Sequence, residues 1–358
     1  MDVRVTVYFF IALLVTVGFC TMKIIIALLI CLTPKVFGHE ICLNSDGKKQ
    51  PLVFDSHKVI YPSATCGQGG RGELFQSDAE KMYVACIGSN NNVISVNDDG
   101  REATLLTPGS TALNVLPGTN FSCSSVNKAT VVRDRENDVD GHCRAFKTGF
   151  NIPAPFAPFF HTVYTVCWND TDQHPKWVRN PINPNAVSEI SIDEDLIDTG
   201  IRGKFRFSKA VFGKDYNPRK YYSVSYQKKV GLINTTAGSD FYARGHLAPA
   251  GDFFLAAERW ATFSLENVVP QWQSHNSGAW KEIETKARRV KDAYMAETGP
   301  IYSSSAEKTF LDTDNNLLPI PDELYKIVYD KNGKELYREK SKMLPRSLGR
   351  RHRHHSVK

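Results

Sequence analysis

Three kinds of hydrophobic pattern divide this chain. Two nearly uninterrupted apolar runs, residues 5–19 and 24–32, stand at its start. Short stretches in which apolar and polar residues alternate follow, such as 81–87 and 130–133, and this alternation is typical of β-strands with one buried face. Residues 274–294 contain no proline, and their apolar residues recur at helical spacing, which predicts an amphipathic helix.

The opening runs indicate targeting to the secretory route. Met22 and Lys23 give the second run a basic start and Gly38 supplies a small residue before His39, so residues 1–38 are predicted to be a signal peptide. The first run is either an extended start or a single-span anchor. Neither run reaches the ~18–20 apolar residues of a membrane helix, so we expect a secreted, extracellular protein with no membrane anchor after cleavage.

Cysteine usage supports export. Six cysteines remain after residue 38, and all lie before residue 168. No two of them have the Cys-x-x-Cys spacing of a zinc site, so we expect no zinc. They are predicted to form three disulfides, and all 15 connectivities stay open. The six are Cys42, Cys66, Cys86, Cys123, Cys143 and Cys167. Sequons at Asn120, Asn169 and Asn234 predict a glycoprotein.

The chain after residue 38, about 320 residues, is long enough for two domains. Alternating stretches punctuated by Gly, Asn, Ser and Thr predict a small, β-rich, disulfide-braced domain over residues 39–144. A proline-broken passage at 151–158 stands near the boundary, and a strand at 161–168 opens the second domain, residues 145–337. Cys167 is expected to tie the two domains together.

Basic residues are concentrated in two segments, although the formal net charge is only +6. Residues 201–231 carry nine Lys or Arg against one Asp, with seven aromatic residues between them. Basic groups follow phosphates and aromatic rings stack on bases, so the segment predicts sequence-independent binding of DNA and RNA, with contacts from Lys228 and Lys229. The alternative is a half-buried sheet with solvated lysines.

The second basic segment, residues 338–358, holds eight Lys or Arg and one Glu and is predicted to be a disordered tail. It either binds nucleic acid or anionic surfaces, or it is a truncated end. The sequence predicts no oligomeric state.

A candidate catalytic constellation lies in the second domain. Arg244 and His246 flank a glycine, and Asn276, Glu284 and Arg288 follow within the predicted helix. At about 100° per residue, the last three lie on or beside one edge of its apolar stripe. A histidine can take a proton from water near pH 7, an amide oxygen suits Mg²⁺, and an arginine stabilises phosphate charge. These residue types fit phosphodiester hydrolysis; the alternative is a core helix with solvated charges.

The run Arg244-Gly245-His246, followed by Leu-Ala-Pro-Ala, resembles the signature of the DNA/RNA non-specific endonucleases, the ββα-metal or His-Me finger family. Asn276, in an Asn-x-Gly-x-Trp-like context, extends the likeness. The resemblance covers roughly residues 206–300 and extends more weakly to about residue 330. The resemblance implies an α+β fold, in which a ββα-metal nuclease domain with a mixed sheet and helices follows the disulfide-braced domain. Secreted arthropod nucleases, including salivary forms, have a similar Cys-bearing N-terminal region.

The resemblance also implies the role of each residue. His246 would be the general base, in a catalytic signature that includes Arg244. Asn276 would bind one Mg²⁺, with Mn²⁺ as an alternative, and Glu284 would hold water around that ion. Arg288 would contact the phosphate.

The resemblance is incomplete in two respects. The upstream phosphate-binding arginine of the family matches either Arg206 or Arg219. The family has Asp where this chain has Ala243, and such a loss typically costs ~10–100-fold in metal affinity or activity. Asp240 is expected to point to the opposite face of an extended segment.

The sequence therefore predicts a secreted, Mg²⁺-dependent, sugar-non-specific endonuclease with reduced activity. The first alternative is a secreted nucleic-acid-binding protein on a nuclease scaffold, with residual or no cleavage. A polyanion binder unrelated to nucleic acid is the third hypothesis, supported only by the basic segments.

Overall fold

A computed structural model describes residues 39–44, 50–55, 57–66, 72–78, 82–88, 93–96, 102–105, 113–114, 120–138, 143–152, 158–182, 205–234, 240–302 and 308–345. The predicted signal peptide lies outside these residues, and so does the end of the chain from residue 346.

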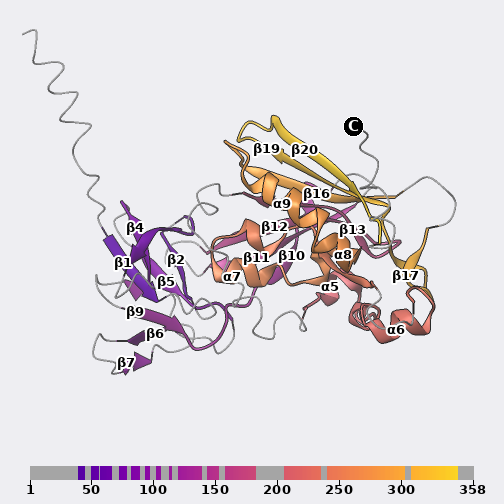
Figure 1. The fold of residues 1–358 in the computed structure, drawn as a ribbon. Coiled ribbons are helices and arrows are strands. Elements are labelled where there is room, and N and C mark those ends of the chain that lie inside the picture. The colour runs from indigo at the N-terminus through magenta and orange to yellow at the C-terminus, as the bar shows by residue number, and fades with distance from the viewer. Residues whose placement is uncertain are drawn as a thin grey trace, which may run out of the picture.

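Three small antiparallel sheets form the N-terminal part of the described chain (Figure 1). In the first, β4 (Gly72–Ser77) lies between β1 (His39–Asn44) and β3 (Pro62–Cys66). In the second, β5 (Tyr83–Ala85) lies between β2 (Leu52–Phe54) and β8 (Leu113–Asn114). In the third, β6 (Val93–Val96) lies between β7 (Glu102–Leu105) and β9 (Asn120–Cys123). The strand predicted within residues 81–87 is β5, so the β-rich character of this region is confirmed.

Two disulfides brace the described chain. Cys86 and Cys123 fasten the end of β5 to β9, with a Cα–Cα distance of 5.6 Å. Cys143 and Cys167 are joined with a Cα–Cα distance of 5.3 Å. Cys42 and Cys66 lie on β1 and β3, and their side chains are outside the described residues.

A seven-stranded sheet, in the order β10-β11-β12-β13-β16-β19-β20, forms the centre of the molecule (Figure 1). Its strands are β10 (Thr130–Arg133), β11 (Arg144–Ile152), β12 (Phe159–Asn169), β13 (His174–Pro181), β16 (Met295–Ile301), β19 (Glu323–Tyr329) and β20 (Glu335–Lys342). Its strand pairs are antiparallel rather than mixed as expected, because short connections such as the β12–β13 turn reverse the chain. The α+β class is confirmed.

This sheet changes two of the predicted boundaries. Thr130–Arg133 forms β10 as predicted but pairs with β11, so a domain boundary after residue 144 falls inside the sheet. The Cys143–Cys167 disulfide therefore braces one sheet. The prediction of a disordered tail is wrong for residues 338–345, since β20 pairs with β19 along its length and buries Met343 beyond its end. Composition favoured disorder there, but a two-residue alternation of exposed and half-buried positions anchors the strand.

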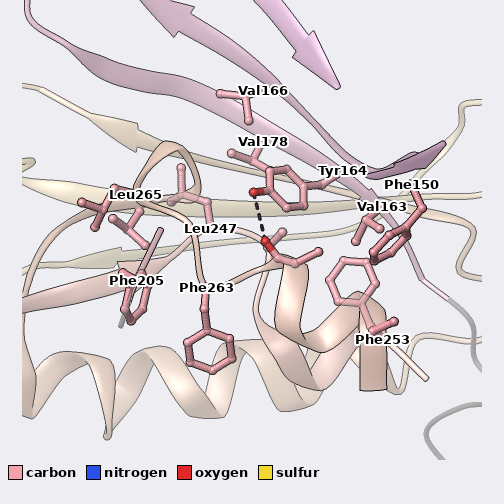
Figure 2. Packing of buried hydrophobic residues seen from close by; sticks show 14 of the residues in the cluster. Phe150, Val163, Tyr164, Val166, Val178, Phe205, Leu247, Phe253, Phe263 and Leu265 are labelled. Atoms are coloured by element: carbon pink, nitrogen blue, oxygen red, sulfur yellow. Dashed lines mark hydrogen bonds between the residues drawn. The ribbon is translucent and has the colours of Figure 1, made fainter. Parts of the chain in front are cut away.

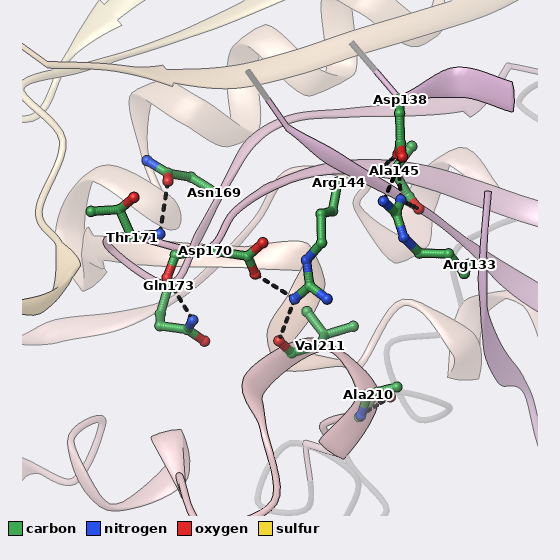
Figure 3. Close-up of polar contacts among 11 residues, drawn as sticks. Arg133, Asp138, Arg144, Ala145, Asn169, Asp170, Thr171, Gln173, Ala210 and Val211 are labelled. Atoms are coloured by element: carbon green, nitrogen blue, oxygen red, sulfur yellow. Dashed lines mark hydrogen bonds and ion pairs between the residues drawn. The ribbon is translucent and has the colours of Figure 1, made fainter. Parts of the chain in front are cut away.

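Charged side chains fasten the turns at one end of the sheet (Figure 3). Arg144 donates to Asp170 and, at 3.2 Å, to the carbonyl oxygen of Val211 in α5 (Lys209–Phe212). Arg133 pairs with Asp138 and donates to the carbonyl oxygen of Ala145 at 2.7 Å. The Arg144–Val211 hydrogen bond holds the start of the basic segment against the sheet.

A hydrophobic core lies between the sheet and the segment that follows His246 (Figure 2). Val163, Tyr164 and Val178 of the sheet are buried, and the Tyr164 hydroxyl donates to the carbonyl oxygen of Ala261 at 3.4 Å. Ala261 ends α7 (Ala256–Ala261), and Leu247 and Phe263 pack into the same core. The chain that follows the candidate histidine is thereby fixed against the sheet.

The same core joins the N-terminal sheets to the large sheet. The rings of Phe54 and Phe159 meet edge to face with their centroids 6.3 Å apart. The buried Glu258 carboxylate on α7 accepts a hydrogen bond from the Tyr61 hydroxyl at 2.8 Å, and the His161 Nε2 atom lies 2.8 Å from the same oxygen.

The helix predicted over residues 274–294 is shorter and interrupted. α8 (Gln273–Asn276) and α9 (Ala279–Arg288) are separated at Gly278, whose φ of −111° and ψ of −109° are not helical. A Cβ at Gly278 would lie 2.7 Å from the carbonyl oxygen of Ser274, which explains the glycine. Trp280, Ile283 and Ala287 form the buried face of α9, whereas Tyr294 is 59% exposed and precedes β16.

Candidate active site

The strand β14 (Tyr242–His246) carries the Arg-Gly-His run and pairs with β15 (Val268–Trp272). His246 ends the strand opposite Val268, and its ring lies 5.2 Å from that of Phe205 and 5.0 Å from that of Phe263. A Cβ at Gly245 would lie 2.0 Å from Gln271 Oε1, so only glycine lets the two strands pack this closely.

Two arginines contact Phe205, whose ring lies next to His246: Arg244 contacts the ring and Arg219 the backbone carbonyl. The Arg244 guanidinium carbon is 5.1 Å from the Phe205 centroid and 5.6 Å from that of Tyr222. Arg219 Nε donates to the Phe205 carbonyl oxygen at 2.7 Å, and this arginine is exposed. Burial lowers the pKa of Arg244, and the nearby charge of Arg219 lowers it further. Sequence spacing did not indicate this pairing of charges.

The other upstream candidate, Arg206, is held inside the protein. Its backbone bridges to Ser264, and its Nη2 atom donates to the carbonyl oxygen of Trp260 at 3.3 Å. Burial lowers the pKa of Arg206, while the Glu266 carboxylate opposes that shift. Of the two arginines that the sequence left open, Arg219 is the exposed one.

Asn276 ends the short helix α8, which contacts both β14 and β15. Asp240 fixes the start of this helix: its carboxylate accepts from the Ser274 backbone N at 3.1 Å and also from the Ser274 hydroxyl. Asn276 is half-buried, and no described residue makes a hydrogen bond to its side chain. Its amide oxygen is therefore available beside the strand that carries His246.

His275, which the sequence pattern did not indicate, connects α8 to two strands. Its Nδ1 lies 2.8 Å from Gln271 Nε2 of β15, and its Nε2 lies 2.8 Å from Ser341 Oγ of β20. Burial lowers the pKa of His275 to about 4, so the ring is neutral at pH 7, accepting from Gln271 and donating to Ser341. A histidine next to a candidate ligand was the only available signal, because Ser341 is 66 residues away.

Arg288 lies at the end of α9 in a buried group of charges. Its Nη1 atom is 3.1 Å from Asp252 Oδ1, and Lys326 Nζ is 3.2 Å from Asp252 Oδ2. A Cβ at Gly251 would lie 3.0 Å from Arg288 Nη1, so the loop after His246 packs directly on this guanidinium. The structure thus joins the two halves of the motif through Asp252.

Glu284 lies one turn before Arg288 on the same helix. Burial raises its pKa to about 7; Asp252 raises it further, while Lys326 and Arg288 oppose the shift. The side chain is half-buried by accessible surface. A carboxyl that titrates near neutral pH inside a charged cluster is a recurrent feature of functional sites.

Lys228 and Lys229 end α6 (Val224–Lys229), which is attached to β14. The buried Gln227 side chain accepts from the Tyr242 backbone N and donates to its carbonyl oxygen, both at 2.9 Å. The predicted base-stacking role of the aromatic residues in this segment is not favoured. Tyr221 and Tyr222 are buried. The rings of Phe212, Tyr216, Tyr221 and Tyr226 pack in a row, with successive centroids 5.0–6.1 Å apart.

Within the part of the chain that the structure describes, no group of three or more His, Cys, Asp or Glu side chains is arranged to hold a metal ion. A metal site here would depend on Asn276, a nearby carboxylate and water.

The profile of the DNA/RNA non-specific endonuclease family matches residues 142–351. The chain belongs to this family, whose match covers the large sheet except β10, together with β14, β15 and α9.

Curated relatives include salivary and mitochondrial proteins. The salivary endonuclease of Lutzomyia longipalpis is 28% identical over 235 residues, which are 61% of this chain and 54% of that protein. The salivary protein Tsal1 of Glossina morsitans morsitans is 24% identical over 72% of this chain and 68% of its own length. The mitochondrial nuclease EXOG of Xenopus laevis is 26% identical over 52% of this chain and 47% of its own length. The chain thus spans about half the length of the first and third.

Among solved structures, a chain of the EndoG/EndoGI complex is similar with a TM-score of 0.35 and 22% identity, over 51% of this chain and 71% of that one. The family assignment does not depend on that likeness. No helix within the described residues has the length and apolar character to cross a membrane.

Proposed function

We propose that this protein is a metal-dependent endonuclease that hydrolyses phosphodiester bonds in DNA and RNA without sequence preference. The observation that carries the proposal is the consecutive packing of β14, β15, α8 and α9. The strand with Arg244 and His246 pairs with β15, α8 with Asn276 contacts both strands, and α9 with Glu284 and Arg288 contacts α8. Family membership supports it.

Each residue of the site has a separate role in the proposed reaction. His246 accepts the proton of the attacking water, as an imidazole can near neutral pH. Arg244 and Arg219, which both contact Phe205, bind the phosphate through guanidinium hydrogen bonds, with Arg219 taking the upstream role in place of Arg206. Arg288 adds positive charge while Asp252 holds one of its nitrogens. Lys228 and Lys229 bind neighbouring phosphates.

The residues present fit one Mg²⁺, with Mn²⁺ as an alternative. The Asn276 amide oxygen is a hard ligand without a competing hydrogen bond among the described residues, and Glu284 is a carboxylate suited to holding water nearby. When bound, the ion would supply Lewis-acid stabilisation of charge on the phosphate.

A second function rests on Ala243. The missing carboxylate predicts weaker metal binding, and Asp240 is already engaged with Ser274 at the start of α8. A nucleic-acid-binding protein with little or no cleavage would use the same basic surface. We place attenuated cleavage first, because His246, Asn276, Glu284 and Arg288 are all present.

We also propose that the protein is secreted after removal of residues 1–38. The apolar runs at the start of the sequence, the disulfides and the two salivary relatives support this location. The N-terminal sheets would form one domain and the chain from β10 onward the nuclease domain.

The test is degradation of plasmid DNA and of RNA by the secreted protein, with Mg²⁺ and with a chelator. We expect metal-dependent cleavage that His246→Ala abolishes and that the exposed control His57→Ala retains. Cleavage that persists in chelator and in His246→Ala contradicts the proposal. Salt-sensitive binding without any cleavage favours the second function.

A further inference from the structure

A cavity of about 460 Å³ opens at the end of the β14–β15 pair away from His246. Its walls come from segments far apart in the sequence: the ends of β14 and β15, the chain around Tyr302 and Lys308, the approach to β19, and the end of β20. This cavity is called the Trp272 pocket below. The volume is within the usual range for small-ligand sites.

Aromatic rings form one wall of the Trp272 pocket. Tyr242 and Trp272 face each other across the strand pair, with ring centroids 3.9 Å apart and planes 30° apart. Tyr302 lines the pocket as well, with Lys308 Nζ 5.6 Å from its ring centroid. Stacking on such rings binds nucleobases of any sequence, because every base has a π face.

The charged groups of the pocket are mixed in sign. Lys308 and Lys342 line it together with Asp322 and Glu323. Lys308 is paired with Asp172 at 2.7 Å, whereas Lys342 is exposed and no described carboxylate forms an ion pair with it. A phosphate inside would be repelled by the two carboxylates, but a base offers amino donors to carboxylates and ring acceptors to lysines. The chemistry therefore fits a nucleobase, with Lys342 near a phosphate beside it.

The pocket is aligned with the candidate active site. Tyr242, Arg244 and His246 alternate along β14 and share one face, and the two ends of this row are about 13 Å apart at ~3.3 Å per residue. Trp272 directly precedes α8, which carries Asn276. A nucleic-acid strand following this face would pass Arg244 between the pocket and His246.

We propose that the Trp272 pocket binds an unpaired nucleobase of the substrate, a short distance along the strand from the phosphate to be cleaved. This inference rests on the proposed function. A base inside a duplex must be unstacked and unpaired to enter, at a cost of a few kcal/mol. The pocket therefore favours single-stranded DNA and RNA over duplex.

The test compares binding of a fluorescent single-stranded oligonucleotide and of its duplex, in chelator. Trp272→Leu should weaken single-strand binding by ~5–150-fold, since stacking contributes ~1–3 kcal/mol per base, and should change duplex binding less than twofold. Trp272→Phe should recover most of the loss. Lys342→Gln should weaken single-strand binding a few-fold, whereas Lys334→Gln, exposed at the opposite end of the β19–β20 hairpin, should leave it unchanged.

Circular dichroism and urea unfolding establish that each variant is folded. If Trp272→Leu is unfolded, Lys342→Gln against Lys334→Gln decides the question alone. Folded variants that bind single strands as the wild type does overturn the inference, and so do equal losses on single strands and duplex. Neither result affects the proposed function, which is decided separately by whether cleavage requires the metal ion and His246.

Discussion

Single side chains decide how tightly the candidate site is built. Gly245 on β14 leaves room for the Gln271 side chain of β15, and Gly251 in the loop after β14 leaves room for the Arg288 guanidinium of α9. Ala243 lies on β14 opposite Gln271. It is the one motif position at which this chain lacks a charge that the resemblance leads us to expect.

Restoring that charge is the first test at this scale. Ala243→Asp should raise metal-dependent cleavage ~10-fold or more, because a carboxylate would order the water around the ion. Nucleic-acid affinity should change little, since phosphate contacts elsewhere supply most of it. Initial rates on plasmid DNA across a Mg²⁺ series measure the gain. A rate equal to that of the wild type would mean that another group already fills the position.

Glu284 predicts a pH dependence of stability. Burial raises its pKa to about 7, above the ordinary value of 4.5, so the folded state binds this proton more tightly. The associated stability is complete below pH 4.5 and is lost as the pH rises through 7. Between pH 5 and 8 the wild type should lose about 1–3 kcal/mol more than Glu284→Gln, since one unit is about 1.4 kcal/mol and solvent screens part of it. Equal losses in urea unfolding would contradict this.

At the scale of elements, α8 depends on its neighbours rather than on its own length. A helix of four residues is too short to be stable alone. Asp240 fixes its start, and His275 connects it to Gln271 on one strand and to Ser341 on another. The position of Asn276 is therefore set by β15 and β20 together.

This dependence predicts a measurable coupling. His275→Ala should lower the free energy of unfolding by about 2–4 kcal/mol, because it opens a cavity and leaves buried polar partners unpaired. Ser341→Ala should cost about 1 kcal/mol, and the double variant should show a coupling energy of at least 0.5 kcal/mol. Ser277→Ala is the control, because Ser277 is exposed and lies two residues after His275. Additive effects in urea unfolding would contradict this coupling and show that β20 does not position α8.

At the scale of the whole molecule, the basic residues form a surface only where the fold brings them together. Gln227 attaches α6 to β14, and the Phe205 carbonyl holds Arg219 near Arg244. The aromatic residues of the same segment fill the core beneath. Basic and aromatic residues alternate along this segment in the sequence. In the fold, the described basic residues except Arg206 lie at the surface and the aromatic residues pack toward the core.

Neutralising this surface should change the salt dependence of binding. For duplex DNA, each phosphate contact contributes about −0.9 to the slope of log K against log salt. The triple variant of Arg219, Lys228 and Lys229 to Gln should therefore flatten the slope by up to ~2.7. Replacing Lys331, Lys334 and Lys340, exposed on the β19–β20 hairpin, removes the same charge and should flatten it less. Equal slopes for the two variants would place the binding face elsewhere.

The sequence by itself determined the family, the α+β class, the strands at 130–133 and 161–168, and the residues of the motif. These follow from local causes: a two-residue alternation marks a half-buried strand, and reactive side chains at fixed spacing mark a chemistry. Residues 274–294 show the limit of such reasoning, because the apolar stripe continues past both Gly278 and the end of α9.

Only the tertiary structure decided which distant residues meet. The Asp252 carboxylate receives Arg288 and Lys326, 36 and 74 residues away, and His275 meets Ser341 across 66 residues. The tertiary structure also turns residues 338–342, whose composition favoured a disordered tail, into part of a strand, because β20 forms hydrogen bonds with β19. Such pairings depend on the register of non-neighbouring strands, and that register is a property of the folded sheet and not of any one segment.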